Sequence, residues 1–202
     1  MGELRVHNFS ISLDGYGAGP DQSGQQPLGA GGERLHEWIF DEAATDVDRR
    51  FRARGEEGVG ATVMGRNMFG PVRGDWGVSD WRGWWGEDPP FHHDVFVLTH
   101  HARDPVAMAG GTTFHFVTGG IEAALEQARA AAGGAHVRLG GGVSTVRQYL
   151  AAGLLDELHV AVVPVLLGSG ERLFGDLGAA PDDWRCVEFA PSASVAHVRL
   201  RR

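Results

Sequence analysis

Three consecutive glycines between an apolar segment and an amphipathic segment restrict the fold of this chain more than any other feature. Gly140–Gly142 follow residues 135–139, which have the composition of a short buried strand. Val143, Val146 and Leu150 then fall at the spacing of one helix face. Glycines at such a junction allow close backbone approach to a ligand, and the free N–H groups of the next helical turn favour an anion. The pattern predicts a phosphate cradle; the alternative is a tight turn that only packs a helix on a sheet.

A second phosphate-like signal lies at Met64–Phe69, where a glycine-arginine turn follows another apolar segment. The 18 basic residues are all arginine, because the chain contains no lysine. This excludes a Walker-type phosphate lysine, a Schiff-base lysine for pyridoxal phosphate and a lysine general base. Any bound phosphate must therefore be held by backbone amides, arginine, histidine or hydroxyl groups.

The rest of the chain alternates between strand and helix patterns, which is typical of βαβ units and a mostly parallel sheet. Strands are expected at 4–13, 58–64, 94–99, 113–118, 135–139 and 157–167, with a hairpin of 185–190 and 194–201. Helices are expected at 33–54, after Gly120, and from Val143 to Ala152. Residues 16–32 and 69–90 are expected to be long loops, the first of them a functional lid or a disordered segment. The sequence predicts one α/β domain over residues 1–202, with an antiparallel C-terminal edge.

Composition excludes several classes of partner. The net charge is −8, and an acidic chain without a basic cluster is a poor candidate for binding nucleic acid or an anionic membrane. No apolar stretch approaches the ~20 residues of a membrane span, and Met1–Phe9 lacks the layout of a signal peptide. We therefore expect a cytoplasmic protein. The single cysteine, Cys186, lies in an expected strand and is predicted to be a small buried residue rather than a nucleophile.

Three expected strand ends carry polar or glycine-rich residues, and ligands bind beyond the carboxyl ends of parallel strands. The three segments are 65–67, 99–103 and 140–142. Arginine and histidine beside a hydroxyl group suit a dianionic phosphate at a distance from the glycine cradle, as in a dinucleotide with a 2′-phosphate. The Gly-x-Gly-x-x-Gly motif of the ordinary Rossmann layout is not present near the N-terminus.

The order of these motifs resembles the dihydrofolate reductase family. The resemblance rests on Met64–Phe69, Val97–Thr99, Val137–Gly142 with the following helix, and Leu155–Val160. Two further segments, Ser12–Tyr16 and Leu167–Phe174, are more similar to the branch that contains the reductase domain of bacterial riboflavin biosynthesis, the RibD C-terminal-like branch. The resemblance covers nearly the whole chain. It implies a three-layer dihydrofolate reductase-like fold with helices on both faces of the sheet.

The resemblance implies NADPH as the cofactor. Gly65, Arg66, Asn67 and Met68 would begin the helical turn that meets the cofactor's phosphates. Thr99, His100 and Arg103 would surround the 2′-phosphate. The residues that would cradle the pyrophosphate are Gly140, Gly141, Gly142, Val143, Ser144 and Thr145. Each of these roles has an alternative without a cofactor. Arg66 would then be a surface ion-pair partner, and His100 and its neighbour His101 would be solvated loop residues.

Fewer residues can be assigned to the substrate-binding part of the site. Asp14 matches the riboflavin branch and would lie beside the nicotinamide as a catalytic residue, or would accept backbone N–H bonds as a turn residue. Trp38 would wall the substrate pocket or pack helix on sheet, and Arg172 would contribute to a substrate phosphate site. The carboxylates expected on the helix at 33–54 (Glu37, Asp41, Glu42, Asp46 and Asp48) include none that can be matched to the pterin-binding acid of dihydrofolate reductase.

The implied activity is hydride transfer from NADPH to a small heterocyclic or ribosylamino-pyrimidine substrate, of the 5-amino-6-(5-phosphoribosylamino)uracil reductase type. The alternatives are reduction of dihydrofolate or another dihydropterin, a non-catalytic NADPH-binding protein on the same fold, and a purely structural module. Trp76, Trp81, Trp84 and Trp85 would stack near the substrate, fold their loop onto itself or form a dimer surface. The resemblance makes a homodimer plausible. The histidine pairs at 92–93 and 100–101 have no further ligands at fixed spacing, so no metal site is predicted.

Overall fold

The described part of the chain forms a layered α/β structure. This computed structural model describes residues 2–41, 44–71, 74–77, 80–175, 177–178 and 183–202. The strands are β1 (Leu4–Ser12), β2 (Tyr16–Ala18), β3 (Val59–Gly65), β4 (Asp94–Leu98), β5 (Val106–Ala107), β6 (Thr113–Val117), β7 (His136–Gly141), β8 (Glu157–Val163), β9 (Glu171–Arg172), β10 (Arg185–Pro191) and β11 (Ala196–Arg201). The helices are α1 (Glu37–Phe40), α2 (Asp46–Arg54), α3 (Arg66–Phe69), α4 (Gly120–Ala131) and α5 (Val143–Ala151), with 3₁₀ turns at Gly32–Leu35 and Ala109–Gly111.

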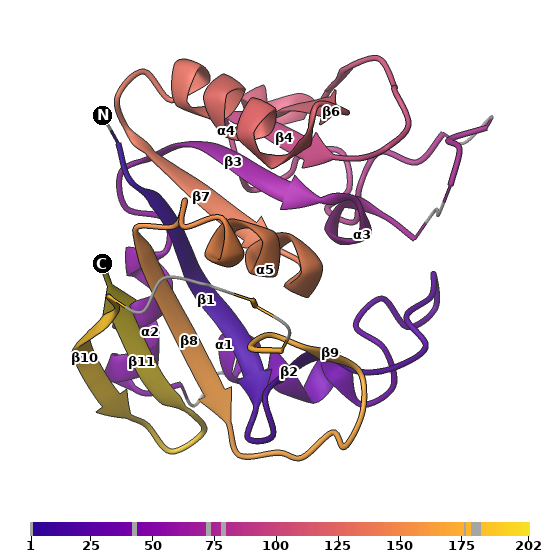
Figure 1. The fold of residues 1–202 in the computed structure, drawn as a ribbon. Helices are drawn as coiled ribbons and strands as arrows, with labels where there is room; N and C mark the ends of the chain where they lie inside the picture. The colour runs from indigo at the N-terminus through magenta and orange to yellow at the C-terminus, as the bar shows by residue number, and fades with distance from the viewer. Residues whose placement is uncertain (1, 42–43, 72–73, 78–79, 176, 179–182) are drawn as a thin grey trace.

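The main sheet has the order β10-β11-β8-β1-β7-β3-β4-β6-β5 (Figure 1). The strands from β8 to β6 are parallel, whereas β11 and β10 add an antiparallel C-terminal edge and β5 pairs antiparallel with β6. The predicted fold class, a mostly parallel sheet with an antiparallel C-terminal edge and helices on both faces, is confirmed. Because the central strands are parallel, their carboxyl ends meet along one edge of the sheet.

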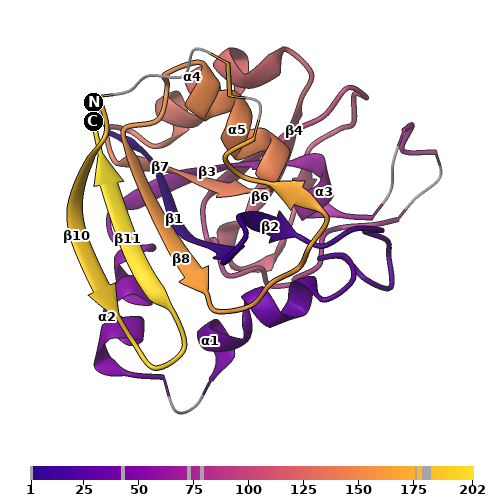
Figure 2. The ribbon, with the colours of Figure 1, turned by 60° about the horizontal axis from the view of Figure 1, so that its bottom comes forward.

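Helices α4 and α5 cover one face of the sheet, and α2 covers the other (Figures 1 and 2). The apolar side chains of β1, β3, β7 and β8 pack with those of α4 and α5 in the largest core cluster. Tyr149 of α5 is fully buried there, and its hydroxyl group donates a 2.7 Å hydrogen bond to the backbone carbonyl of Ile121. This bond satisfies the polar end of a side chain whose ring is otherwise apolar. Within the described residues, no helix is long and apolar enough to cross a membrane.

A chain of buried polar groups connects β1 with α2. The backbone N–H of Asn8 donates to Nδ1 of His159 at 3.0 Å, and Nε2 of His159 lies 3.0 Å from Nδ1 of His197. Nε2 of His197 lies 2.9 Å from a carboxylate oxygen of Asp48, at the start of α2. The ring of Phe51 stacks on both histidines. The Asn8 N–H, the ring nitrogens of both histidines and the Asp48 carboxylate thus all have partners, as buried polar groups require.

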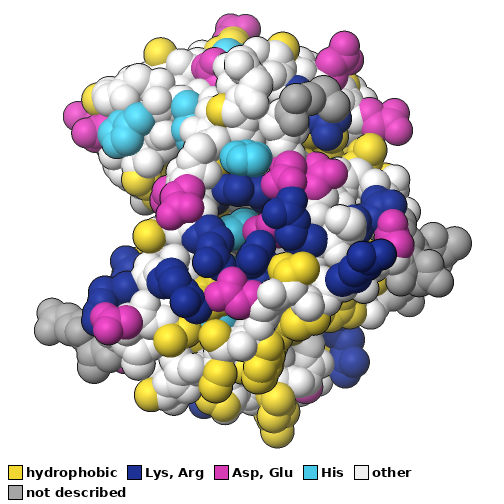
Figure 3. Space-filling model, turned by 90° about the vertical axis from the view of Figure 1, so that its left-hand side faces the viewer, with side chains coloured by type: hydrophobic (Ala, Val, Ile, Leu, Met, Phe, Trp, Pro, Cys, Tyr) yellow, Lys and Arg dark blue, Asp and Glu magenta, His cyan; other side chains and the backbone are white. Residues whose placement is uncertain are grey.

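Arginines gather near the amino ends of β1 and β7, with carboxylates among them (Figure 3). The register places Arg201, Glu157, Arg5 and Arg138 side by side on neighbouring strands. Arg201 lies 3.3 Å from Glu157, and Arg138 lies 2.5 Å from Glu56. The positive charge on this side of the molecule is therefore offset by ion pairs.

The helix expected at 33–54 is interrupted, so that prediction was wrong in its continuity. A 3₁₀ turn and the short α1 end at Phe40, and α2 begins after Thr45. Thr45 and Asp48 form a capping box, in which each side chain bonds the other residue's backbone N–H and starts a new helix. Glu42 lies outside the described residues.

Three other boundaries differ from the predictions. The strand expected at 157–167 ends at Val163, because the backbone turns there and the N–H of Val165 bonds the carbonyl of Val163. Further along, the N–H groups of Leu167 and Gly168 bond Asp14. The expected loop at 16–32 begins with β2, which pairs with β9. Cys186 is exposed rather than buried, because β10 is the outermost strand of the sheet and most of its side chains face solvent.

Candidate functional site

A cavity of about 480 Å³ opens at the carboxyl ends of the parallel strands. Its walls come from β1, β3, β7, the start of α5, the turns after β4 and β6, and the segment that follows β2. The predicted cofactor residues that line it are Gly65, Arg66, Asn67, Met68, Thr99, His100, Gly140, Gly141, Gly142, Val143, Ser144 and Thr145. The structure thus brings together three sequence segments that lie up to 80 positions apart (65 to 145).

The glycine turn between β7 and α5 forms one wall. The first backbone bond of α5 runs from Val146 N–H to the carbonyl of Gly142, so the three preceding N–H groups have no partner within the helix. Gly142 caps the helix without a side chain, and a Cβ added to it would meet no atom within 4 Å. Gly141 has a φ of 127°, which favours glycine, and the Gly141–Gly142 peptide is cis. Unpaired amides and open space at a helix start suit an anionic group.

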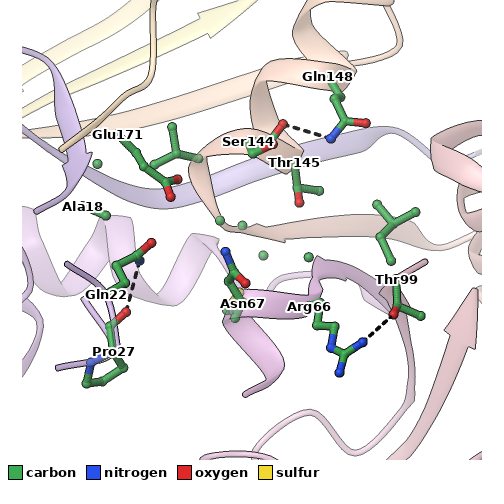
Figure 4. A pocket seen from close by; sticks show the side chains of 18 of the residues that line it. Ala18, Gln22, Pro27, Arg66, Asn67, Thr99, Ser144, Thr145, Gln148 and Glu171 are labelled. Atoms are coloured by element: carbon green, nitrogen blue, oxygen red, sulfur yellow. Dashed lines mark hydrogen bonds between the residues drawn. The ribbon is translucent and has the colours of Figure 1, made fainter. Parts of the chain in front are cut away.

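The end of β3 approaches this turn closely because Gly65 has no side chain. A Cβ at Gly65 would collide with the hydroxyl oxygen of Thr145. The glycine therefore allows the start of α3, with Asn67 and Arg66, to face the start of α5 across the cavity (Figure 4).

Arg66 and Arg103 pack on one indole ring at the end of the cavity near β4. The guanidinium carbon of Arg66 lies 3.4 Å from the centroid of Trp76, and that of Arg103 lies 4.9 Å from it. Arg66 donates a 3.2 Å hydrogen bond to the hydroxyl oxygen of Thr99, and Trp76 Nε1 donates to the carbonyl of His101 at 2.7 Å. Trp76 is thus a buried platform for both cations.

These two arginines keep buried donors without partners. Nε and Nη2 of Arg66 and Nη1 of Arg103 are buried, yet no described residue accepts a hydrogen bond from them. Burial and the charge of Arg103 lower the pKa of Arg66 from its ordinary value against the opposing charge of Asp75. Burial likewise lowers the pKa of Arg103 against the charge of Asp80. Two cations held close together with unused donors are stabilised when an anion accepts those donors.

Four predicted site residues lie outside the cavity lining. Arg103 reaches the site only through the Trp76 ring, as described above. The Asp14 carboxylate accepts hydrogen bonds from the Ser12 hydroxyl group at 2.6 Å and from the N–H groups of Leu167 and Gly168. The Ser12 bond, together with those two N–H groups, lowers the pKa of Asp14 to about 2 against the opposing effect of burial. These bonds match the alternative given for Asp14 above, a turn residue that accepts backbone N–H bonds.

Trp38 and Arg172 complete this group of four. Trp38 is buried against the sheet, and its Nε1 donates a 2.9 Å bond to the hydroxyl group of Ser10, which itself lines the cavity. The guanidinium group of Arg172 lies over the ring of Tyr16, 4.7 Å from its centroid. The loop tryptophans 76, 81 and 85 pack in or against an apolar cluster with Phe69 and Phe114.

Several lining residues were not found by the sequence reasoning. They include Phe9, Ser10, Gln22, Leu28, His36, Thr118, Gln148 and Glu171. The only signal for Gln22 and Leu28 was the length of their loop, and the only signal for Glu171 was its place in the segment 167–174. No group of three or more histidine, cysteine, aspartate or glutamate side chains that suits a metal ion occurs among the described residues.

Comparison with solved structures shows the same fold in other proteins. A protein from Shewanella sp. PV-4 provisionally assigned to riboflavin biosynthesis has 21% sequence identity and a TM-score of 0.65, with 100% of this chain and 99% of that chain covered. A diaminohydroxyphosphoribosylaminopyrimidine deaminase/5-amino-6-(5-phosphoribosylamino)uracil reductase from Thermotoga maritima has 12% identity and a TM-score of 0.58, with 99% and 56% covered. Dihydrofolate reductase from Enterococcus faecalis, complexed with NADP(H), has 15% identity and a TM-score of 0.54, with 100% and 96% covered.

No curated protein matches the sequence. The model of one family, described as the RibD C-terminal domain, matches residues 6–198 and so includes almost every strand and helix described above. The chain belongs to the RibD C-terminal domain family.

Proposed function

We propose that this protein is an NADPH-dependent reductase that acts on a small heterocyclic substrate. The observation that carries the proposal is the pair of arginines packed on Trp76, which keep three buried donor atoms without a described partner at the end of the cavity that Arg66 lines. The open glycine turn at the start of α5 lies further along the same cavity. One extended ligand with two separate anionic groups fits this arrangement.

The residues present fit NADPH at both anionic positions. Arg66 and Thr99, supported by Arg103, would hold the 2′-phosphate, because guanidinium groups form strong charge-assisted bonds with phosphate. The N–H groups at the start of α5 would hold the pyrophosphate, where Gly142 leaves room. The nicotinamide would then lie towards β1, next to Phe9 and Ala18.

Bound NADPH supplies a hydride for the reaction. The protein's own residues position the two reactants and exclude water from the transfer. The apolar side chains that line the cavity include Pro27, Leu28, Phe9 and Val143. This apolar surround supports hydride transfer, which needs no covalent nucleophile.

The similar proteins support the same class of activity. The Thermotoga maritima protein is a reductase of a phosphoribosylamino-pyrimidine, and the Enterococcus faecalis structure holds NADP(H). Reduction of a dihydropterin remains the second candidate for the reaction, as does a protein that binds NADPH without turnover.

The test is a titration with NADPH and, separately, NADH, followed by the quenching of tryptophan fluorescence. Arg66→Gln should weaken NADPH binding about 10- to 150-fold, since a hydrogen bond to a charged group contributes roughly 1.5–3 kcal/mol. NADH, which lacks the 2′-phosphate, should be affected little. Arg185→Gln, which removes the same charge from the exposed strand β10, serves as the control. Failure of both nucleotides to bind, or an equal loss for both in Arg66→Gln, would refute the proposal.

Oxidation of NADPH in the presence of dihydropterins and aminopyrimidines then separates an enzyme from a binding protein. Turnover that disappears in Gly142→Val would support a reductase. Tight NADPH binding with no oxidation by either class of compound would favour the non-catalytic alternative.

A further inference from the structure

The polar groups of the cavity differ in charge between its two ends. Arg66, His100 and His101 line the end near β4. At the other end, near β1, β2 and β9, the polar side chains include Gln22, His36 and Glu171. Figure 4 shows Gln22 and Glu171 on one side of the cavity and Arg66 with Thr99 on the other. If NADPH occupies the first end, as proposed above, the second end receives the substrate.

Glu171 is the only carboxylate among the described lining residues. It belongs to β9, and backbone pairing of that strand with β2 places it opposite Ala18. No described side chain or backbone N–H donates a hydrogen bond to its carboxylate. The strand pairing thus fixes the backbone of Glu171 and leaves both carboxylate oxygens available to a ligand.

His36 contributes a second unused polar atom to the same end. Its Nδ1 is buried and has no described hydrogen-bond partner. Burial lowers the pKa of His36 from its ordinary value, outweighing a backbone hydrogen bond with Gly32, so the ring is neutral at pH 7. The amide of Gln22, which also lines the cavity, donates a 3.1 Å bond to the carbonyl of Pro27 and carries no charge.

A phosphate group has no cationic partner among the described residues at this end. Arg172, the nearest arginine in sequence to Glu171, packs on Tyr16 rather than lining the cavity. A phosphate dianion placed here would face the Glu171 carboxylate, and two like charges at close range are unfavourable. A pair of N–H groups on a planar ring would instead match the two carboxylate oxygens.

We infer that the substrate of this protein is an unphosphorylated heterocycle with adjacent N–H donors, such as an aminopyrimidine or amidine edge, and that Glu171 is the residue that recognises it. This inference rests on the proposed function, because NADPH is placed at the arginine end. It differs from the phosphoribosylamino substrate that the resemblance to riboflavin-pathway reductases implies.

The experiment uses 2,4-diaminopyrimidine as the probe, because its 2-amino group and the ring N–H of its protonated form are adjacent donors. Binding is measured by isothermal titration calorimetry on the full chain, with and without saturating NADPH. We expect the probe to bind and Glu171→Gln to weaken it about tenfold or more, as the loss of a charge-assisted bond implies. Glu126→Gln, on the exposed side of α4, removes the same charge away from the cavity and should leave the affinity unchanged. Millimolar orthophosphate should not displace the probe from the NADPH-saturated protein.

Three outcomes would overturn the inference: no binding of the probe, equal affinity in Glu171→Gln and the parent protein, or displacement of the probe by orthophosphate. A gain-of-function variant gives an independent check. Gln22→Arg places a cation at this end, and it should make the bound probe sensitive to orthophosphate; continued insensitivity would contradict the assignment. The NADPH titration is read separately, so a failure of the cofactor proposal is distinguishable from a failure of this one.

Discussion

The buried chain from Asn8 to Asp48 predicts a specific loss of stability in acid. The backbone N–H of Asn8 can only donate, so Nδ1 of His159 must accept. Nε2 of His159 therefore carries a proton and donates to Nδ1 of His197, whose Nε2 in turn donates to the Asp48 carboxylate. Both histidines are neutral in this arrangement, and a second proton on His159 would point at the Asn8 N–H. Protonation of His159 in acid therefore requires that these hydrogen bonds break.

The size of the effect follows from the shift in pKa. Burial, together with the nearby His197 and His7, lowers the pKa of His159 from 6.5 to about 2. The unfolded chain binds this proton as the pH falls through 6.5, whereas the folded chain does not. The stabilising contribution is therefore complete above pH 6.5 and is lost as the pH falls from there towards 2. The slope is about 1.4 kcal/mol per pH unit, or about 2 kcal/mol between pH 6.5 and 4.5, a large share of the roughly 5–15 kcal/mol of a typical domain.

The assay is urea unfolding at a series of pH values for the parent protein and for His159→Asn. The parent should lose about 2 kcal/mol more unfolding free energy over this interval than the variant, because asparagine does not titrate. His100→Asn, at an exposed position in the turn after β4, is the control and should follow the parent. An unchanged dependence on pH in His159→Asn would refute the reasoning, whatever the variant's absolute stability.

Three further predictions concern the cavity wall and the core. Gly142→Val should weaken NADPH binding at least about tenfold with little change in unfolding free energy, because its side chain enters open space; unaltered affinity in the fluorescence titration would contradict this. Gly65→Ala should lower the free energy of unfolding by roughly 1–3 kcal/mol, since the added methyl group collides with Thr145; urea unfolding checks this. Tyr149→Phe should cost about 1 kcal/mol in the same assay, because the Ile121 carbonyl loses its donor, and an unaltered midpoint would show that water replaces the bond.

The sheet could be predicted from the sequence because each of its main strands has a recognisable local pattern. Apolar segments bounded by glycine or polar residues gave β1, β3, β4, β6 and β7 to within two residues. The region 33–54 was mispredicted because Leu35, Val47 and Phe51 keep a helical spacing across the break between α1 and α2. The signal that the prediction overlooked is the Thr45–Asp48 capping box.

The two ends of the site also differ in how far local sequence patterns predict them. Arg66, Thr99 and the glycine turn follow strands directly, so position along a strand was enough to place them. Glu171 and His36 enter the cavity through the pairing of β2 with β9 and through a short 3₁₀ turn, and neither has a periodic pattern in the sequence. That end of the cavity depends on the pairing of residues about 150 positions apart in the sequence. Local sequence patterns do not predict such contacts.

The difference between the two ends of the cavity also affects how the sequence of such a protein can change in evolution. The end near Arg66 and the glycine turn is made from strands and a helix that form the main core, so substitutions there that lack open space, such as those at Gly65, disturb folding. The opposite end is made largely by residues 17–36 and β9, which are tied to the rest by β1, by the β2–β9 pairing and by the Asp14 bonds. Substitutions at the exposed positions of that segment therefore leave the core strands and helices intact. A lineage built on this scaffold is free to exchange one substrate for another while it inherits the rest of the site unchanged.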